Sequence, residues 1–224
     1  MVAFVLAANG PDSLIWWDWV GRHTHQIGAA LLEHVELTVV AVGTGLLVSI
    51  PFALLARHYR RTRAPIFAAF GVLYTIPSLA LFFLLGPFTG YLTVRTAEIA
   101  LVAYTLLILV RNIVLGLDGV PAEAREAARG MGYRPWQLLL RVELPLAMPS
   151  VLAGLRVATV STVGLVTVAS FIGHGGLGQL IQDGLRRNFS TPLMVGALLS
   201  VALALVADLL LLTVQRLATP WSRR

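Results

Sequence analysis

Long stretches without charge divide this chain into apolar and polar segments. A helix needs about 20 apolar residues to cross the roughly 30 Å hydrocarbon core of a membrane. Five stretches reach that length with no charge or only isolated charges: residues 37–56, 64–86, 97–117, 146–170 and 192–212. The stretches are unbroken rather than alternating, which argues against the ten-residue strands of a membrane β-barrel. The pattern therefore predicts five transmembrane helices.

The segment before the first apolar stretch has a different character. Residues 13–32 contain Trp16, Trp17 and Trp19. Tryptophan is enriched at the depth where a membrane meets water. We therefore expect an N-terminal interfacial segment, such as an amphipathic helix that lies on the membrane.

The composition also indicates a membrane protein. Hydrophobic residues make up 57% of the 224 residues and charged residues 12%, and the mean hydropathy is +0.80. A soluble domain is about 45–50% apolar and about 25% charged. So few charges could not cover the surface of a soluble fold, which excludes a cytosolic enzyme and a disordered chain. The net charge of +6 is spread over short loops, so we expect no nucleic-acid partner. The predicted fold class is an all-α integral membrane protein.

The distribution of arginine predicts the orientation. All 17 basic residues are arginine. With the C-terminus inside, the inner segments carry eleven arginines and the outer segments four, which agrees with the positive-inside rule. The N-terminus is then outside, and the 118–145 loop is cytoplasmic. The predicted division is an extracytoplasmic or interfacial segment over 1–30, a transmembrane domain over 31–217 and a cytoplasmic tail over 218–224.

The loop over residues 118–145 is longer than most connections between membrane helices. Pro121 suits a first helical turn, and the Ala, Glu and Arg residues after it are strong helix formers. Gly130 and Gly132 should end or bend this helix. The sequence thus predicts a short cytoplasmic helix in the first half of the loop.

A second short helix is predicted over residues 135–142, with Trp136 among its apolar side chains. Pro145 and Pro149 are expected to break the chain at the entry to the fourth span. Two short helices with small faces and protruding apolar side chains would form a docking surface on the cytoplasmic side.

The spacing within this loop resembles the EAA loop of permease subunits of binding-protein-dependent ABC importers. The matching residues are Glu126, Ala127, Ala128, Gly132, Val142, Leu144 and Pro145. The one departure is Val142, where the family pattern has Ile. In that family the loop forms coupling helices that sit in a cleft of the ATPase subunit. The resemblance therefore implies an ATPase-coupling role for these residues, with Trp136 on the same surface.

The chain has no residue that could serve as the lysine of a phosphate-binding P-loop. That loop needs Gly-x4-Gly-Lys-Ser/Thr, and lysine is absent from the sequence. We therefore expect a transport subunit without enzymatic activity or a cofactor of its own, with ATP and Mg bound by a partner ATPase.

Three further stretches resemble permeases for osmoprotectants such as glycine betaine, carnitine and choline. They are residues 74–82, residues 109–113 and residues 143–156 continuing to 172–178. The resemblance covers roughly residues 30–215. It implies a bacterial inner-membrane importer with an extracytoplasmic substrate-binding protein and a second permease chain, either identical or related. Two alternatives remain: an importer of an amino acid or another small solute, and a secondary transporter that needs no ATPase.

A glycine-rich stretch follows the fourth span. Gly173, Gly175, Gly176 and Gly178 fit a dinucleotide-binding spacing, but they follow a membrane helix rather than a strand, and no suitable acidic residue comes about 20 positions later. We interpret the stretch as a non-helical bend and a candidate outer gate. The alternative is a flexible loop.

A few residues within the spans are candidates for the transport pathway. Charges inside a membrane usually face a partner or a cavity, so Arg156 could pair with Asp208. The alternative is that its side chain extends to the inner membrane surface. Pro77 should kink the second span, and the nearby Tyr74 could contact a quaternary ammonium group. His23 and His25 have no third ligand close in sequence, so no metal site is predicted.

Overall fold

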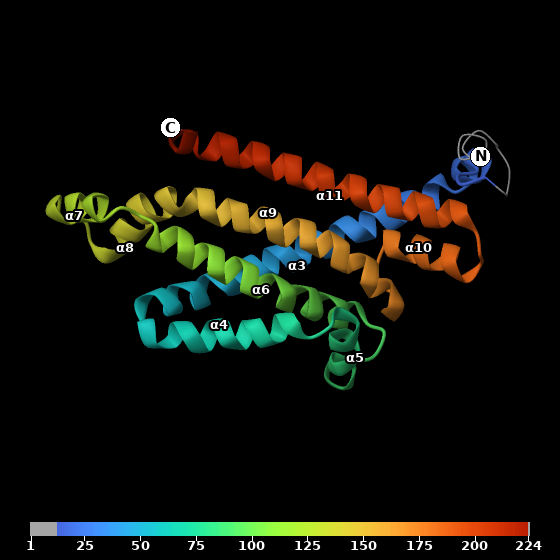
Figure 1. The fold of residues 1–224 in the computed structure, drawn as a ribbon, viewed down its shortest axis with the longest axis horizontal. Helices are drawn as coiled ribbons and strands as arrows, with labels where there is room; N and C mark the ends of the chain where they lie inside the picture. The colour runs from blue at the N-terminus through green and yellow to red at the C-terminus, as the bar shows by residue number, and fades with distance from the viewer. Residues whose placement is uncertain (1–12, 224) are drawn as a thin grey trace. The chain divides into compact units, whose positions relative to one another are not determined.

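The computed structural model describes residues 13–223, which form helices and contain no strand (Figure 1). The elements are α2 (Trp17–Arg22), α3 (Thr24–His58), α4 (Arg60–Thr75), α5 (Ser78–Thr89), α6 (Val94–Asp118), α7 (Ala122–Gly130), α8 (Pro135–Leu138), the π-helical turn η1 (Leu139–Glu143), α9 (Leu144–Ala169), the 3-10 turn η2 (Ser170–Ile172), α10 (Leu177–Arg186), α11 (Ser190–Ala218) and the 3-10 turn η3 (Pro220–Arg223).

Within the described residues, four helical stretches are long and apolar enough to cross a membrane. They are Thr24–His58, Val94–Asp118, Pro135–Ile172 and Ser190–Ala218. Each contains one of the predicted apolar stretches. A fifth candidate is formed only by α4 and α5 together, as a broken pair. The all-α membrane fold predicted from the sequence is confirmed.

The second predicted span, residues 64–86, is not one continuous helix. Proline has no backbone N–H, and it disfavours the helical conformation of the residue before it. Pro77 adopts φ −55° and ψ 133°, so the chain is extended between α4 and α5. The expected kink at Pro77 is therefore a complete break in the helix.

The break expected at Pro145 and Pro149 is absent, and this prediction is wrong. The chain stays helical from Pro135 to Ile172. The helix widens at η1, where the N–H of Leu144 donates to the carbonyl of Leu139, five residues earlier. This π-turn lies just before Pro145 and changes the hydrogen-bond pattern there, whereas Pro149 lies within the α-helical part of α9. The predicted second loop helix and the fourth span are therefore one helical unit.

The tryptophan-rich segment is only partly an independent helix. Residues 17–22 form α2, whereas residues 24–32 belong to α3, and the first twelve residues of the predicted 1–30 segment lie outside the described part. The N–H of Trp16 donates to Thr191 Oγ1 at 2.9 Å, and Trp19 packs edge-to-face on Phe189. These contacts attach the segment to the start of α11. Its interfacial location stays a prediction.

The chain divides into two compact units, and each is described by itself. The first comprises Met1–Ala41, Ile76–Val102 and Thr159–Val206, and the second comprises Val42–Thr75, Ala103–Ala158 and Ala207–Arg224. The 118–145 loop belongs entirely to the second unit, and the glycine-rich bend belongs to the first. The domain limits predicted at residues 30 and 217 stay a prediction.

The core of the second unit joins α3, α6 and the start of α9. Ala53, Val110, Val114 and Ala147 are buried together in one apolar cluster. A Cβ atom at Gly116 would lie 2.8 Å from the Ala147 carbonyl oxygen, so only glycine permits this approach of α6 to α9. The close packing fixes the positions of the two helices that the loop connects.

Candidate functional site

The first loop helix, α7, begins and ends where the sequence predicts. Pro121 precedes its first turn, which contains Glu123. At the other end Gly132 has φ +80°. Its N–H donates to the backbone carbonyl of Arg129, and the N–H of Tyr133 donates to the backbone carbonyl of Ala128. This pair of bonds is a Schellman cap, which needs a left-handed residue that glycine supplies most readily. The predicted stop at Gly132 therefore has a specific structural cause.

The residues of the EAA pattern separate into exposed and buried sets. Glu126, Ala127 and Gly132 are exposed, as is Leu144 at the start of α9. Ala128 is only 1% exposed and packs inward, although it was expected beside Ala127 as a small contact residue. Val142 and Pro145 are half-buried.

Two large side chains extend the exposed part of the loop. Trp136 on α8 is 55% exposed and Met131 after α7 is 67% exposed. Figure 1 shows α7 and α8 beside the N-terminal end of α9. Exposed apolar side chains next to small residues are typical of a surface that another protein covers.

A buried carboxylate holds the loop in place. Glu143 lies in η1, and it accepts from Arg57 at the end of α3 through two bonds of 2.7 and 2.5 Å. Arg125 of α7 places its Nε 3.1 Å from the same carboxylate and donates through Nη2 to the carbonyl of Leu117 at 2.7 Å. Glu143 therefore joins three segments that are far apart in the sequence.

The environment of Glu143 favours its ionised form. Its side chain is 8% exposed, and it precedes the apolar stretch that starts at residue 146. The hydrogen bonds from Arg57 hold the pKa of Glu143 below its usual range, against the opposing effect of burial. A second ion pair, Arg63 Nη1 to Asp118 Oδ2 at 2.6 Å, joins α4 to the end of α6. The loop is thus anchored at both ends.

Sequence reasoning missed Glu143 as an anchor. The residue is visible in the sequence directly before the Leu-Pro pair of the EAA pattern, but its partner Arg57 is 86 positions away. A lone acidic residue next to an apolar span is the signal that could have drawn attention to it, since such charges need partners.

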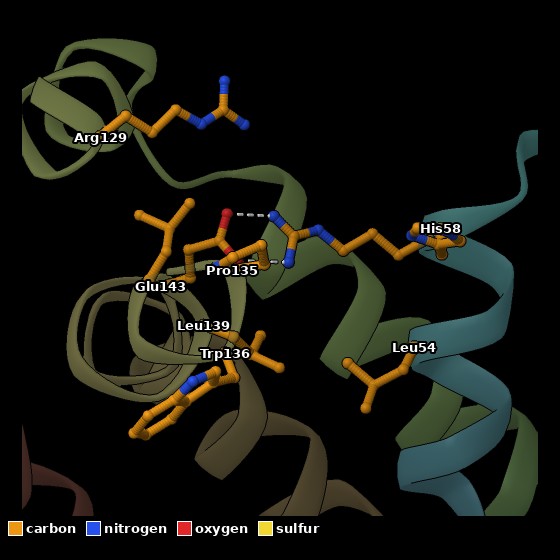
Figure 2. Close-up of a pocket in the computed structure, with 9 residues that line it drawn as sticks. Leu54, His58, Arg129, Pro135, Trp136, Leu139 and Glu143 are labelled. Carbon is orange, nitrogen blue, oxygen red and sulfur yellow. Dashed lines mark hydrogen bonds and ion pairs between the residues drawn. The ribbon is translucent and has the colours of Figure 1, made fainter. Parts of the chain in front are cut away.

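A cavity of about 560 Å³ lies beside this carboxylate (Figure 2). Its lining includes Leu54, Arg57 and His58 from α3, Arg129 from α7 and Trp136 from α8. Figure 2 shows Glu143 and its dashed hydrogen bonds in the middle of the view, with Arg129 on one side and Trp136 on the other. The cavity is therefore both basic and apolar.

The glycine-rich bend lies in the first compact unit. Gly173 (φ +83°) and Gly176 (φ +48°) have left-handed backbone conformations, and α10 begins at Leu177. Gly178 is consequently helical, so the non-helical bend is shorter than predicted. Gln179 Nε2 donates to the carbonyl of Gly173 at 2.9 Å, which closes the turn.

The bend is packed tightly against neighbouring helices. A Cβ atom at Gly176 would clash with the carbonyl oxygen of Ala30 and the backbone of His34, both in α3. Gly175 and Gly178 approach the backbone of α9 and η2 in the same way. These glycines permit close backbone packing, whereas their role in an outer gate stays a prediction.

The predicted pair within the membrane is present. Arg156 of α9 donates to Asp208 of α11 through Nε at 2.9 Å and Nη2 at 2.8 Å. Gln215 adds a bond of 3.1 Å from its Nε2 to the carbonyl of Pro149. Both interactions lie in the second unit, where they attach the last part of α11 to α9.

The remaining pathway candidates lie near the helix break. Tyr74 is in the last turn of α4, 43% exposed, and its ring meets that of Tyr104 edge-to-face at 5.9 Å between centroids. Pro77 is the residue that ends the break before α5. The structure does not bring Tyr74 together with Arg156 or Asp208 in any contact described for these residues.

Comparisons with known proteins agree with these features. A family described as binding-protein-dependent transport system inner membrane component matches residues 45–220. The osmoprotectant import permease protein OsmW of Salmonella typhimurium is 36% identical over 87% of this chain and 92% of its own length. The choline transport system permease protein OpuBB of Bacillus subtilis is 35% identical over 84% of this chain and 86% of its own length.

Solved structures show the same fold at lower identity. A chain of the MetNI methionine ABC transporter in an inward-facing conformation has a TM-score of 0.77, with 21% identity over 88% of this chain and 98% of that chain. A chain of an amino acid ABC transporter has a TM-score of 0.69, with 20% identity over 88% of this chain and 96% of that chain. The family match, the related permeases and the shared fold establish that this chain belongs to the family of inner membrane components of binding-protein-dependent transport systems.

Proposed function

We propose that the chain is the permease subunit of an ABC importer that moves osmoprotectants, such as glycine betaine, choline or carnitine, into a bacterial cell. The observation that carries the proposal is the 118–145 loop, which exposes Glu126, Ala127 and Trp136 while Glu143 anchors it. The substrate class rests on the printed functions of the related permeases.

The anchored loop supports a mechanical role. Arg125 binds Glu143, which lies on the same helical run as α9. A displacement of α7 by an ATPase would therefore act on the fourth span directly, without a flexible joint at Pro145. Movements of rigid elements of this kind can switch a membrane protein between states.

The proposed assembly contains several separate chains. ATPase subunits dock on the 118–145 loops, where they bind ATP and Mg and supply the energy. An extracytoplasmic substrate-binding protein delivers the solute, and a second permease chain, identical or related, completes the pathway. The arginine distribution supports an extracytoplasmic N-terminus and a cytoplasmic C-terminus.

Uptake of labelled solute tests the function. Cells that lack their own osmoprotectant importers would express this chain together with an ATPase and a binding protein from the same organism. We expect glycine betaine uptake that requires the ATPase and is inhibited by choline or carnitine. Uptake of methionine or another amino acid instead, with every subunit present in the membrane, would reject the substrate class but keep the architecture. Uptake without the ATPase would reject the importer class.

A further inference from the structure

The residues around the cavity beside Glu143 carry more positive charge than this one carboxylate can neutralise. Glu143 is the one acidic side chain among the described residues that line it. Arg57 and Arg125 already share this carboxylate, and Arg129 adds a third guanidinium to the same group. A second carboxylate, Asp118, also attracts Arg57, but it is already paired with Arg63. The arginines around Glu143 therefore still outnumber the carboxylates, which favours an anion.

The cavity also has an apolar wall. The apolar residues that line it are Leu54, Leu138 and Leu139, together with the half-exposed Trp136. Inorganic phosphate would use the arginines but would leave this wall without a partner. A ligand that joins an anionic group to a hydrocarbon chain would use both walls.

The position of the cavity along the helices corresponds to the membrane surface. Arg57 and His58 directly follow the apolar stretch that ends at residue 56, and Glu143 lies three residues before the one that starts at residue 146. Lipid phosphates lie at this level, and tryptophan is enriched there. Basic pockets between membrane helices on the cytoplasmic side are suited to anionic headgroups.

We infer that this cavity binds an anionic phospholipid of the cytoplasmic leaflet. The phosphate lies between Arg57 and Arg129, and an acyl chain runs along Leu54 and Leu139. The lipid thereby joins the end of α3 to α7, so it favours the anchored position of the loop. This inference depends on the proposed function for the cytoplasmic placement of the loop, but lipid binding itself requires no transport.

Native mass spectrometry of the detergent-purified chain would test the site. The chain is titrated with phosphatidylglycerol or with phosphatidylcholine, and the fraction that retains lipid is measured. We expect retention of phosphatidylglycerol but not of phosphatidylcholine. Arg129→Gln should weaken retention about fivefold, because one basic residue at an anionic surface contributes roughly that factor.

Arg141→Gln is the matched control. Arg141 is exposed on η1, carries the same charge and does not line the cavity. The control should bind phosphatidylglycerol as the unmodified chain does. Equal losses in the two variants, or equal retention of the two lipids, would overturn the inference. Loss of bound lipid in millimolar inorganic phosphate would assign the cavity to a soluble anion and overturn it as well.

Fluorescence quenching would locate the lipid independently. A variant that keeps Trp136 and replaces the other four tryptophans with phenylalanine reports on this cavity alone. Brominated phosphatidylglycerol should quench Trp136 more than brominated phosphatidylcholine does, and equal quenching contradicts the site. Neither measurement involves solute uptake, so failure of the lipid site and failure of the proposed transport function give different results.

Discussion

Replacement of Gly132 by alanine should open the turn that ends α7. Gly132 has φ +80°, and a Cβ atom built there meets nothing within 4 Å. Steric crowding is therefore absent, and the whole penalty comes from the left-handed backbone, about 1–2 kcal/mol for a residue with a Cβ. A penalty of this size makes the open form of the turn about 5- to 30-fold more populated than in the unmodified chain.

Hydrogen exchange measures this population directly. The amide of Tyr133 is protected by its bond to the Ala128 carbonyl, so its exchange should accelerate by the same factor in Gly132→Ala. Gly132→Asn should have a smaller effect because asparagine tolerates the left-handed region. In the complete transporter, Gly132→Ala should also reduce ATP hydrolysis coupled to solute uptake.

Gly130→Ala is the matched control for this prediction. Gly130 also has open space for a Cβ atom, but it is the last residue of α7 and does not have a positive φ. Alanine there should stabilise the helix by about 0.5–1 kcal/mol. If the amide hydrogen of Tyr133 exchanges at the same rate in both alanine variants, the argument from backbone strain is wrong.

Three further predictions concern the anchors of the fold. Glu143→Gln should lower the free energy of unfolding by about 1–3 kcal/mol, measured by thermal melting in detergent, because two half-buried arginines lose their carboxylate. Arg156→Asp or Asp208→Arg alone should reduce the amount of chain in the membrane, and the double exchange should restore it. Gly176→Ala should lower the melting temperature strongly through both strain and a backbone clash, whereas Gly164→Ala, with open space, should not.

Each of these predictions has an outcome that contradicts it. Unchanged melting of Glu143→Gln would mean that the loop is held by apolar packing alone. A double charge exchange no more abundant than either single variant would argue against a direct pair in the membrane. Equal melting of the two alanine variants at Gly164 and Gly176 would show that the bend adapts to a side chain.

The sequence by itself was sufficient for features that depend on local composition. The apolar stretches mark the membrane helices because each must be long enough to cross the hydrocarbon core. The pair of Arg156 and Asp208 was one of two possibilities for Arg156, because isolated charges within spans need partners or must reach the membrane surface. The end of α7 was predictable because Gly132 can adopt the left-handed backbone conformation, which other residues rarely adopt.

Only the tertiary structure decided the features that depend on distant residues or on backbone continuity. The break at Pro77 and the uninterrupted helix at Pro145 involve the same residue type, so the residue type alone does not decide whether the helix continues. The anchor at Glu143 and the cavity beside it join α3, α7 and η1. A sequence pattern cannot reveal such sites, because charges and apolar surfaces form one environment only after the helices pack.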